Sequence, residues 1–216
     1  SAKELESYQV DFWHIDSIDN LKVFEDIDSL KNASHIPIDL HIISKTPESY
    51  YPYLGKENIG RVSIQIEDMD DDFVFPSLDD KEIGMAIQIN HPRILEMIVK
   101  YQSHVDFVLL MMTTPGKSGG KFEKESFSII RNIVTAFPQM NWCVDGGVDH
   151  EISYILRLVG VQSVVVGSYL MNHKNMAEAI INIRANRVRS EYKVSDFQIP
   201  LDQLPIINDG ESVVNM

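Results

Sequence analysis

Basic side chains and long apolar runs are both scarce in this chain of 216 residues. Against 32 Asp and Glu there are only 19 Lys and Arg, so the formal net charge is −13. Since proteins bind nucleic acid largely by neutralising phosphates with basic side chains, we expect no nucleic-acid partner. The sequence also contains no run of about 18 apolar residues, the length that a helix needs to span a bilayer. Residues 1–10 also lack the basic and apolar regions of a secretory signal, so we expect no membrane association.

Cysteine is the third scarce component. The one cysteine, Cys143, cannot form an intramolecular disulfide, and its apolar neighbours are typical of a small buried residue on a strand. A chain without disulfides is typical of a reducing compartment, so we expect a cytoplasmic protein. The remaining composition, with 44% hydrophobic and 24% charged residues, is that of an ordinary globular domain.

Seven short runs rich in Val, Ile and Phe are present instead, separated by segments with helical periodicity. They cover residues 11–16, 36–43, 60–67, 83–90, 105–112, 141–145 and 162–167. Their starts are 21 to 36 residues apart, which is too far for hairpins and suits a strand, a crossover helix and two loops. The sequence therefore predicts seven parallel strands in an α/β fold.

Apolar spacing predicts the helices between these strands. Apolar side chains recur every three or four residues in 124–137 and 152–158, and the longest helical stretch covers 175–192. Such βα units form either an open doubly wound sheet or a closed (β/α)₈ TIM barrel, and their near-constant spacing favours the barrel. Because a barrel has eight strands, we expect its first strand to be missing from this chain or replaced.

The organisation changes beyond Lys193. We predict one (β/α)₈-barrel catalytic domain over residues 1–193 and a C-terminal tail over 194–216. The apolar residues of this extension predict docking on the barrel or on a neighbouring subunit, with an undocked extension as the alternative.

Polar residues stand at the C-terminal ends of several predicted strands, where barrel enzymes place their active sites. His14 and Asp16 are two residues apart, so strand alternation places both on one side of the sheet. Asp39 and His41 share a side for the same reason, and the sixth strand ends at Asp145. A histidine at a single strand end is common without a function. Its recurrence with carboxylates at equivalent positions favours a divalent-metal site.

Glycines follow three of the predicted strands. The loop 113–120 follows the fifth strand, and the pairs Gly146–Gly147 and Gly167–Ser168 follow the last two. Main-chain N–H groups at such junctions commonly hold a phosphate group in barrels. Tight turns alone would also favour glycine and remain the alternative.

Taken together, these segments resemble the ribulose-phosphate 3-epimerases, which are (β/α)₈ barrels that act on pentulose phosphates. The resemblance runs in the family's order from residue 11 to about residue 172. It is carried by WHIDSID at 13–19, PIDLHII at 37–43, MMTTPGKSGGKF at 111–122, VDGGV at 144–148 and VGS at 166–168.

The resemblance implies a role for each matching residue. One divalent metal ion, usually zinc or iron(II) in the family, would be held by His14, Asp16, His41 and Asp145. Manganese or cobalt would also suit these donors. Asp16 and Asp145 would be the catalytic acid and base, one on each face of the substrate. The substrate and its phosphate would contact Met111, Gly119, Gly120, Gly146, Gly147, Gly167 and Ser168, with Gly119 and Gly120 in a lid.

Several positions depart from the family's pattern. Ile18 and Ile43 replace methionines that usually surround the metal, and Gln65 stands in place of a histidine. Lys117 lies in an altered lid segment, and the loop after the first predicted strand is shortened. The departures leave the implied metal ligands in place and indicate altered sugar recognition.

The resemblance therefore implies an isomerase of carbohydrate metabolism, as in the pentose phosphate pathway. We expect a metal-dependent 3-epimerase that converts ribulose 5-phosphate to xylulose 5-phosphate by two-carboxylate proton transfer through an enediolate. The first alternative is an epimerase of a hexulose phosphate such as allulose 6-phosphate. The second is a non-catalytic sugar-phosphate-binding protein. The expected partners are a small phosphorylated ketose and further copies of the chain, since family members are often dimers or hexamers.

Overall fold

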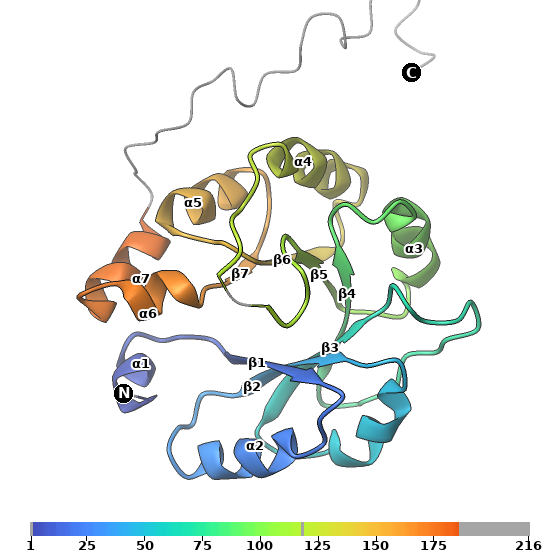
Figure 1. Cartoon of the computed structure of the whole chain (residues 1–216), viewed down its shortest axis with the longest axis horizontal. Helices are drawn as coiled ribbons and strands as arrows, with labels where there is room; N and C mark the ends of the chain where they lie inside the picture. Colours follow the sequence, from blue (N-terminus) through green and yellow to red (C-terminus); the bar gives the residue numbers. More distant parts are fainter. Residues whose placement is uncertain (1, 118, 186–216) are drawn as a thin grey trace, which may run out of the picture.

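Seven strands form one parallel sheet in a computed structural model that describes residues 2–117 and 119–185 (Figure 1). They are β1 (Trp13–Ile18), β2 (Ile38–Ile43), β3 (Ile59–Gln65), β4 (Glu82–Gln88), β5 (Phe107–Met111), β6 (Asn141–Asp145) and β7 (Ser163–Val165). Each strand pairs with its neighbour in sequence, in the order β1 to β7. All seven predicted strands are confirmed, with ends shifted by a few residues.

Helices cover the outside of the curled sheet (Figure 1). They are α1 (Ala2–Ser7), α2 (Val23–Lys31), the 3₁₀-helix η1 (Pro47–Tyr53), α3 (Ile94–Tyr101), α4 (Ser126–Ala136), α5 (His150–Leu158), α6 (Ser168–Asn172) and α7 (Met176–Arg184). The predicted helices at 124–137 and 152–158 are confirmed as α4 and α5. The helix predicted over 175–192 is too long, because α7 ends at Arg184 and Ala185 is extended. Residues 186–192 and the predicted tail at 194–216 lie outside the described residues.

The strand order decides between the two architectures that the sequence left open. In a doubly wound sheet the order reverses at a switch point, whereas here it follows the chain throughout. The α/β architecture of a (β/α)₈ barrel is therefore confirmed. The sheet in the described residues has seven strands, with β1 and β7 as its two edges.

The outward face of the sheet is apolar, whereas the concave face is divided into an apolar and a polar half. The outward face packs on the helices in one large apolar core that includes Leu40, Ile42, Val62 and Ile64. The concave face is apolar along β4 to β6, where Ala86, Phe107, Leu109, Met111 and Cys143 cluster. It is polar along β1 to β3, where the buried side chains include Asp39, His41, Arg61 and Ser63. This asymmetry places the candidate site on one half of the barrel interior.

Helix length bears on one of the exclusions drawn from the sequence. Within residues 2–117 and 119–185, no helix is both long enough and apolar enough to cross a bilayer.

Candidate metal and phosphate site

Three predicted ligands converge on the concave face of β1 and β2. The parallel register pairs His14 with Asp39 and Asp16 with His41, and strand alternation turns all four side chains inward. Asp16 Oδ1 lies 3.2 Å from His14 Nε2 and 3.0 Å from His41 Nδ1. The ligand atoms of His14, Asp16 and His41 all lie within 4.8 Å of one another. One carboxylate oxygen therefore stands between two imidazoles.

Each imidazole is also held by its other ring nitrogen. His14 Nδ1 lies 2.8 Å from Asp39 Oδ2, and His41 Nε2 lies 2.7 Å from Gln65 Oε1. Gln65 in turn donates a hydrogen bond to Glu67. Histidines that bind metals are usually oriented in this way through the nitrogen that does not face the metal. Gln65, at a position where the resemblance implies a histidine, therefore contacts His41 directly.

The cluster shifts the pKa of two of its members strongly. Burial disfavours a charged His14, but the close carboxylates of Asp16 and Asp39 outweigh it and raise the pKa of His14 to about 10. Burial would also raise the pKa of Asp16, yet the close imidazoles of His14 and His41 hold this pKa well below its ordinary value. Positive charge is thus favoured between Asp16 and Asp39.

Asp145 belongs to the same electrostatic environment but not to the three converging ligands. It is the last residue of β6, in register with Met111 at the end of β5. Burial raises the pKa of Asp145, and the nearby charge of Asp16 adds to the rise while the two histidines oppose it. The pKa values of the two carboxyls predicted as acid and base are therefore shifted in opposite directions.

The chemistry of the donor set fits a divalent cation. Two imidazoles and a carboxylate are ligands that zinc, iron(II), manganese and cobalt all accept. His14 Nε2 is buried, and its 3.2 Å contact with Asp16 Oδ1 lacks hydrogen-bond geometry, so in the described part of the chain this nitrogen makes an ion-pair contact without a hydrogen bond. A buried polar atom without a hydrogen bond costs free energy, and a bound cation would remove that cost.

A buried ion pair lies beside this cluster and was missed by the sequence reasoning. Arg61 Nη2 donates to Asp39 Oδ2 at 2.7 Å, and its guanidinium carbon lies 4.5 Å from the ring centre of Phe12. Asp39 therefore binds both Arg61 and His14 through one oxygen. The available signal was a charged residue inside an apolar strand, in register with Asp39.

The substitution Arg61→Met should destabilise the fold by about 3 kcal/mol, because removing one partner of a buried pair leaves the other charge uncompensated. Urea unfolding of the two proteins measures the difference. The matched control is Arg61→Met combined with Asp39→Asn, which removes both charges and should recover part of the loss. Equal stability of Arg61→Met and the unchanged chain would contradict this role of the pair.

Predicted phosphate-binding residues meet in a second place. Gly120, Gly147 and Ser168 line an open pocket of about 560 Å³, together with Lys121, Tyr169 and others. We call it the glycine pocket. The residues come from the loop after β5, the turn after β6 and the start of α6. The structure thus brings together residues separated by up to 48 positions in the sequence.

The remaining predicted contacts lie elsewhere. Gly146 directly follows Asp145, and Met111 is buried inside the barrel. Gly119 is not among the residues that line the glycine pocket, and Gly167 lines a different cavity, between β1 and β7. The structure therefore brings Gly120, Gly147 and Ser168 together and places the other four predicted contact residues apart from this pocket.

Gly147 is required by the local backbone. Its φ is +67°, and an added Cβ would lie 2.5 Å from the main-chain nitrogen of Phe122. Gly119 has a similar φ of +82°, but none of the described residues lies within 4 Å of its added Cβ. We expect Gly119→Ala to cost about 1 kcal/mol, the penalty of the left-handed conformation alone. Gly147→Ala should cost at least about 3 kcal/mol, since overpacking adds to that penalty. Denaturant unfolding of both variants tests this, and equal losses would contradict it.

The curled parallel sheet is that of a TIM-barrel protein, and its polar cluster lies on the strands where enzymes of this fold carry their active sites. The chain belongs to the Ribulose-phosphate 3 epimerase family, whose model matches residues 1–171. This is a family of carbohydrate epimerases, which confirms the resemblance drawn from the sequence.

Relatives of this name occur in bacteria and plants. The chain is 30% identical to Ribulose-phosphate 3-epimerase of Helicobacter pylori strain J99, over 83% of the chain and 88% of that protein. It is 28% identical to the Aquifex aeolicus protein of the same name, over 71% of each chain. Identity to the chloroplastic Ribulose-5-phosphate-3-epimerase of Arabidopsis thaliana is 27%, over 74% of the chain. In that comparison the chain spans 60% of the plant protein.

Solved structures share the fold. The chain matches a 3-hexulose-6-phosphate synthase with a TM-score of 0.59 and 16% identity, covering 87% of this chain and 91% of that one. It matches N-(5'-phosphoribosyl)anthranilate isomerase from Pyrococcus furiosus with a TM-score of 0.54 and 14% identity. That match covers 85% of this chain and 92% of the isomerase. At this identity the likeness concerns the barrel fold alone.

Proposed function

We propose that the chain is a metal-dependent 3-epimerase that interconverts ribulose 5-phosphate and xylulose 5-phosphate. The observation that carries the proposal is the convergence of His14, Asp16 and His41 on the concave face of a family member. Asp145 lies at the end of β6, and the glycine pocket lies at the loops that follow β5, β6 and β7. These groups are the ones that inversion next to a carbonyl requires.

Inversion needs two proton carriers, because a proton leaves one face of the carbon and another arrives on the opposite face. We assign these roles to Asp16 and Asp145. Their opposite pKa shifts support the assignment, since a carboxyl with a low pKa favours the basic form and one with a raised pKa favours the acidic form. The direction of epimerisation decides which carboxyl gives and which takes the proton.

His14, Asp16, His41 and Asp145 would hold the metal ion. When bound, a divalent cation acts as a Lewis acid that stabilises the negative charge developing on the substrate oxygens. Asp39 and Gln65 orient the two imidazoles from behind, and the Arg61 charge keeps Asp39 ionised beside His14. The pKa of Asp39 lies below its ordinary value although burial opposes this, because His14 and Arg61 both bind the carboxylate.

The glycine pocket is assigned to the phosphate. Main-chain N–H groups at Gly147 and Ser168, which line the pocket, would bind the dianion together with those of the adjacent Gly146 and Gly167, as at other barrel strand ends. Gly119 and Gly120 would cover the substrate, and Met111 would contact its carbon chain. Lys121 lines the pocket and adds a positive charge. An acidic protein with a net charge of −13 needs such local groups, because its overall field repels the ligand.

The test is a side-by-side assay of the metal-loaded chain on ribulose 5-phosphate and on allulose 6-phosphate. We expect kcat/KM to favour the five-carbon sugar. Preference for the hexulose phosphate would contradict the proposal and support the first alternative, an epimerase of a hexulose phosphate. The residues that favour this alternative are Ile18, Gln65 and Lys117, which differ from the family's pattern. Binding of both sugars without turnover would support the non-catalytic alternative and contradict the proposal.

Three further expectations remain predictions. They are the catalytic domain over 1–193, the homo-oligomeric assembly and the cytoplasmic location.

A further inference from the structure

The imidazole of His41 lies between Asp16 and Gln65. The ring is fully buried, with Nδ1 3.0 Å from Asp16 Oδ1 and Nε2 2.7 Å from Gln65 Oε1. A neutral imidazole has one nitrogen that donates a hydrogen bond and one that carries a lone pair, so it can donate to only one of these two oxygens. A cation binds the nitrogen with the lone pair. The position of the ring proton therefore decides which nitrogen of His41 can bind the metal ion.

Glu67 determines which end of the Gln65 amide faces His41. The amide nitrogen of Gln65 donates a hydrogen bond to Glu67 Oε2. Glu67 Oε1 accepts a second hydrogen bond, at 2.5 Å, from the main-chain N–H of Gln88 at the end of β4. Because a carboxylate only accepts hydrogen bonds, turning the amide of Gln65 over would place its oxygen against the oxygen of Glu67. The carbonyl oxygen of Gln65 is therefore the atom that faces His41.

A carbonyl oxygen behind the ring places the proton of neutral His41 on Nε2. Nδ1 then presents a lone pair to the carboxylate oxygen of Asp16, 3.0 Å away. These two acceptors repel each other, and a cation that binds both removes the repulsion. The lone pair of Nδ1 thus lies on the side of the ring where Asp16 and His14 converge.

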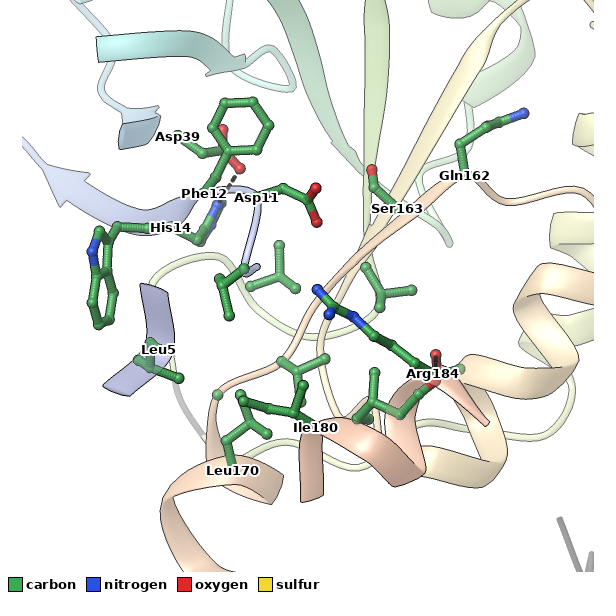
Figure 2. A pocket seen from close by; sticks show the side chains of 18 of the residues that line it. Leu5, Asp11, Phe12, His14, Asp39, Gln162, Ser163, Leu170, Ile180 and Arg184 are labelled. Atoms are coloured by element: carbon green, nitrogen blue, oxygen red, sulfur yellow. Dashed lines mark hydrogen bonds and ion pairs between the residues drawn. The ribbon is translucent and has the colours of Figure 1, made fainter. Parts of the chain in front are cut away.

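The two imidazoles of the site are held by different kinds of acceptor. Behind His14 stands the charged carboxylate of Asp39 (Figure 2), whereas behind His41 stands a neutral amide. A histidine, which the resemblance implies in place of Gln65, could either donate or accept. An amide held by Glu67 can only accept from His41, so this chain specifies one tautomer through a group that does not itself titrate.

We propose that Gln65 and Glu67 are positioning residues that fix the proton of His41 on Nε2 and leave the lone pair of Nδ1 for the divalent ion. The inference rests on the proposed metal site and adds the residues that select the binding nitrogen. Neither residue is one of the assigned metal ligands, and both act through His41. The other tautomer would direct an N–H group toward the ion and weaken its binding.

Nitrogen-15 NMR of the zinc-loaded chain with labelled histidines tests the proposal directly. We expect the ring of His41 to carry its proton on Nε2 and none on Nδ1. This readout does not depend on catalytic activity. A proton on Nδ1, with Nε2 bound to zinc, would overturn the proposal.

Zinc affinity provides the second test. Gln65→Met removes the acceptor and keeps a side chain of similar length, and it should weaken zinc binding by about 10- to 100-fold, the usual loss when a group that orients a metal ligand is removed. The matched control is Gln65→Glu combined with Glu67→Gln, which exchanges the two side chains. The carboxylate at position 65 can still accept from His41, and the amide at position 67 can donate to it. This variant should bind zinc within a few-fold of the unchanged chain, as measured by competition with a chelator.

Urea unfolding separates positioning from a purely structural role. If Gln65→Met loses stability but keeps its zinc affinity and the proton on Nε2, the proposal is wrong. A 10-fold loss of affinity in the exchanged pair would also overturn it, and this variant and the unchanged chain decide the matter if Gln65→Met does not fold. Zinc binding with the proton on Nε2 but without epimerase activity would contradict the proposed function and support this inference. An active chain with the proton on Nδ1 would do the reverse.

Discussion

Asp145→Asn should lower kcat for epimerisation by about 10²- to 10⁴-fold and stop exchange of the substrate's C3 proton with solvent. The carboxylate is assigned to proton transfer on one face of the substrate, and an amide cannot carry the proton. The loss should appear in kcat, since the contacts that bind the phosphate remain. Single-turnover assays with ribulose 5-phosphate measure this.

The matched control for this variant is Asp106→Asn. Asp106 accepts a hydrogen bond from the main-chain N–H of Ile83, at the opposite end of the strands. We expect it to retain activity within a few-fold, because it contacts none of the candidate site. If Asp145→Asn kept normal exchange at C3, the role of Asp145 as acid and base would be wrong, whatever the outcome for Asp106→Asn.

His41→Ala should reduce bound metal from about one ion per chain to a small fraction of that. His41 is fully buried and presents one ring nitrogen to Asp16. The substitution therefore removes one metal-binding nitrogen and also removes the contact that holds the Asp16 carboxylate, a second metal ligand, in place. Removing groups that only orient a metal ligand costs 10- to 100-fold in affinity, and removing a ligand should cost at least about 100-fold. Zinc titration and elemental analysis after dialysis measure both quantities.

The control is His104→Ala, whose imidazole is exposed and contacts Ser103. This variant should keep the metal content of the unchanged chain. A full complement of tightly bound metal in His41→Ala would contradict the assignment of His41 as a ligand. Removal of the metal by a chelator should abolish activity, and restoring zinc or iron(II) should return it.

The sequence predicted the sheet well because the relevant signals are local. Each strand is a short apolar run, and the spacing between runs fixes the parallel connection. The convergence of His14, Asp16 and His41 follows from alternation within two neighbouring strands, which a sequence displays directly. These predictions needed no knowledge of long-range packing.

Features that depend on distant contacts were not predictable in the same way. The helical pattern of 175–192 continues past the true end of α7, but Arg157 of α5 donates hydrogen bonds to the main-chain oxygens of Ile183, Arg184 and Ala185. That contact from another helix satisfies the last carbonyls of α7, and Ala185 is extended. The spacing of apolar residues in the sequence does not indicate this contact between Arg157 and the end of α7.

The Arg61 pair illustrates the same limit. Asp39 was placed on the inward face, yet its role depends on a residue 22 positions away on the next strand. Charge inside an apolar strand signals a buried partner or ligand, but it does not identify which one. The register between β2 and β3 supplies that identity.

The central claim is proton transfer at C3 of a ketose phosphate by a metal-loaded site. Incubation of the chain with ribulose 5-phosphate in deuterium oxide, followed by proton NMR, tests it most directly. We predict that one deuterium enters C3 of both the substrate and the xylulose 5-phosphate formed, and that a chelator stops the incorporation. A chain that contains one metal ion, binds the sugar phosphate and leaves its C3 proton unexchanged would contradict the account.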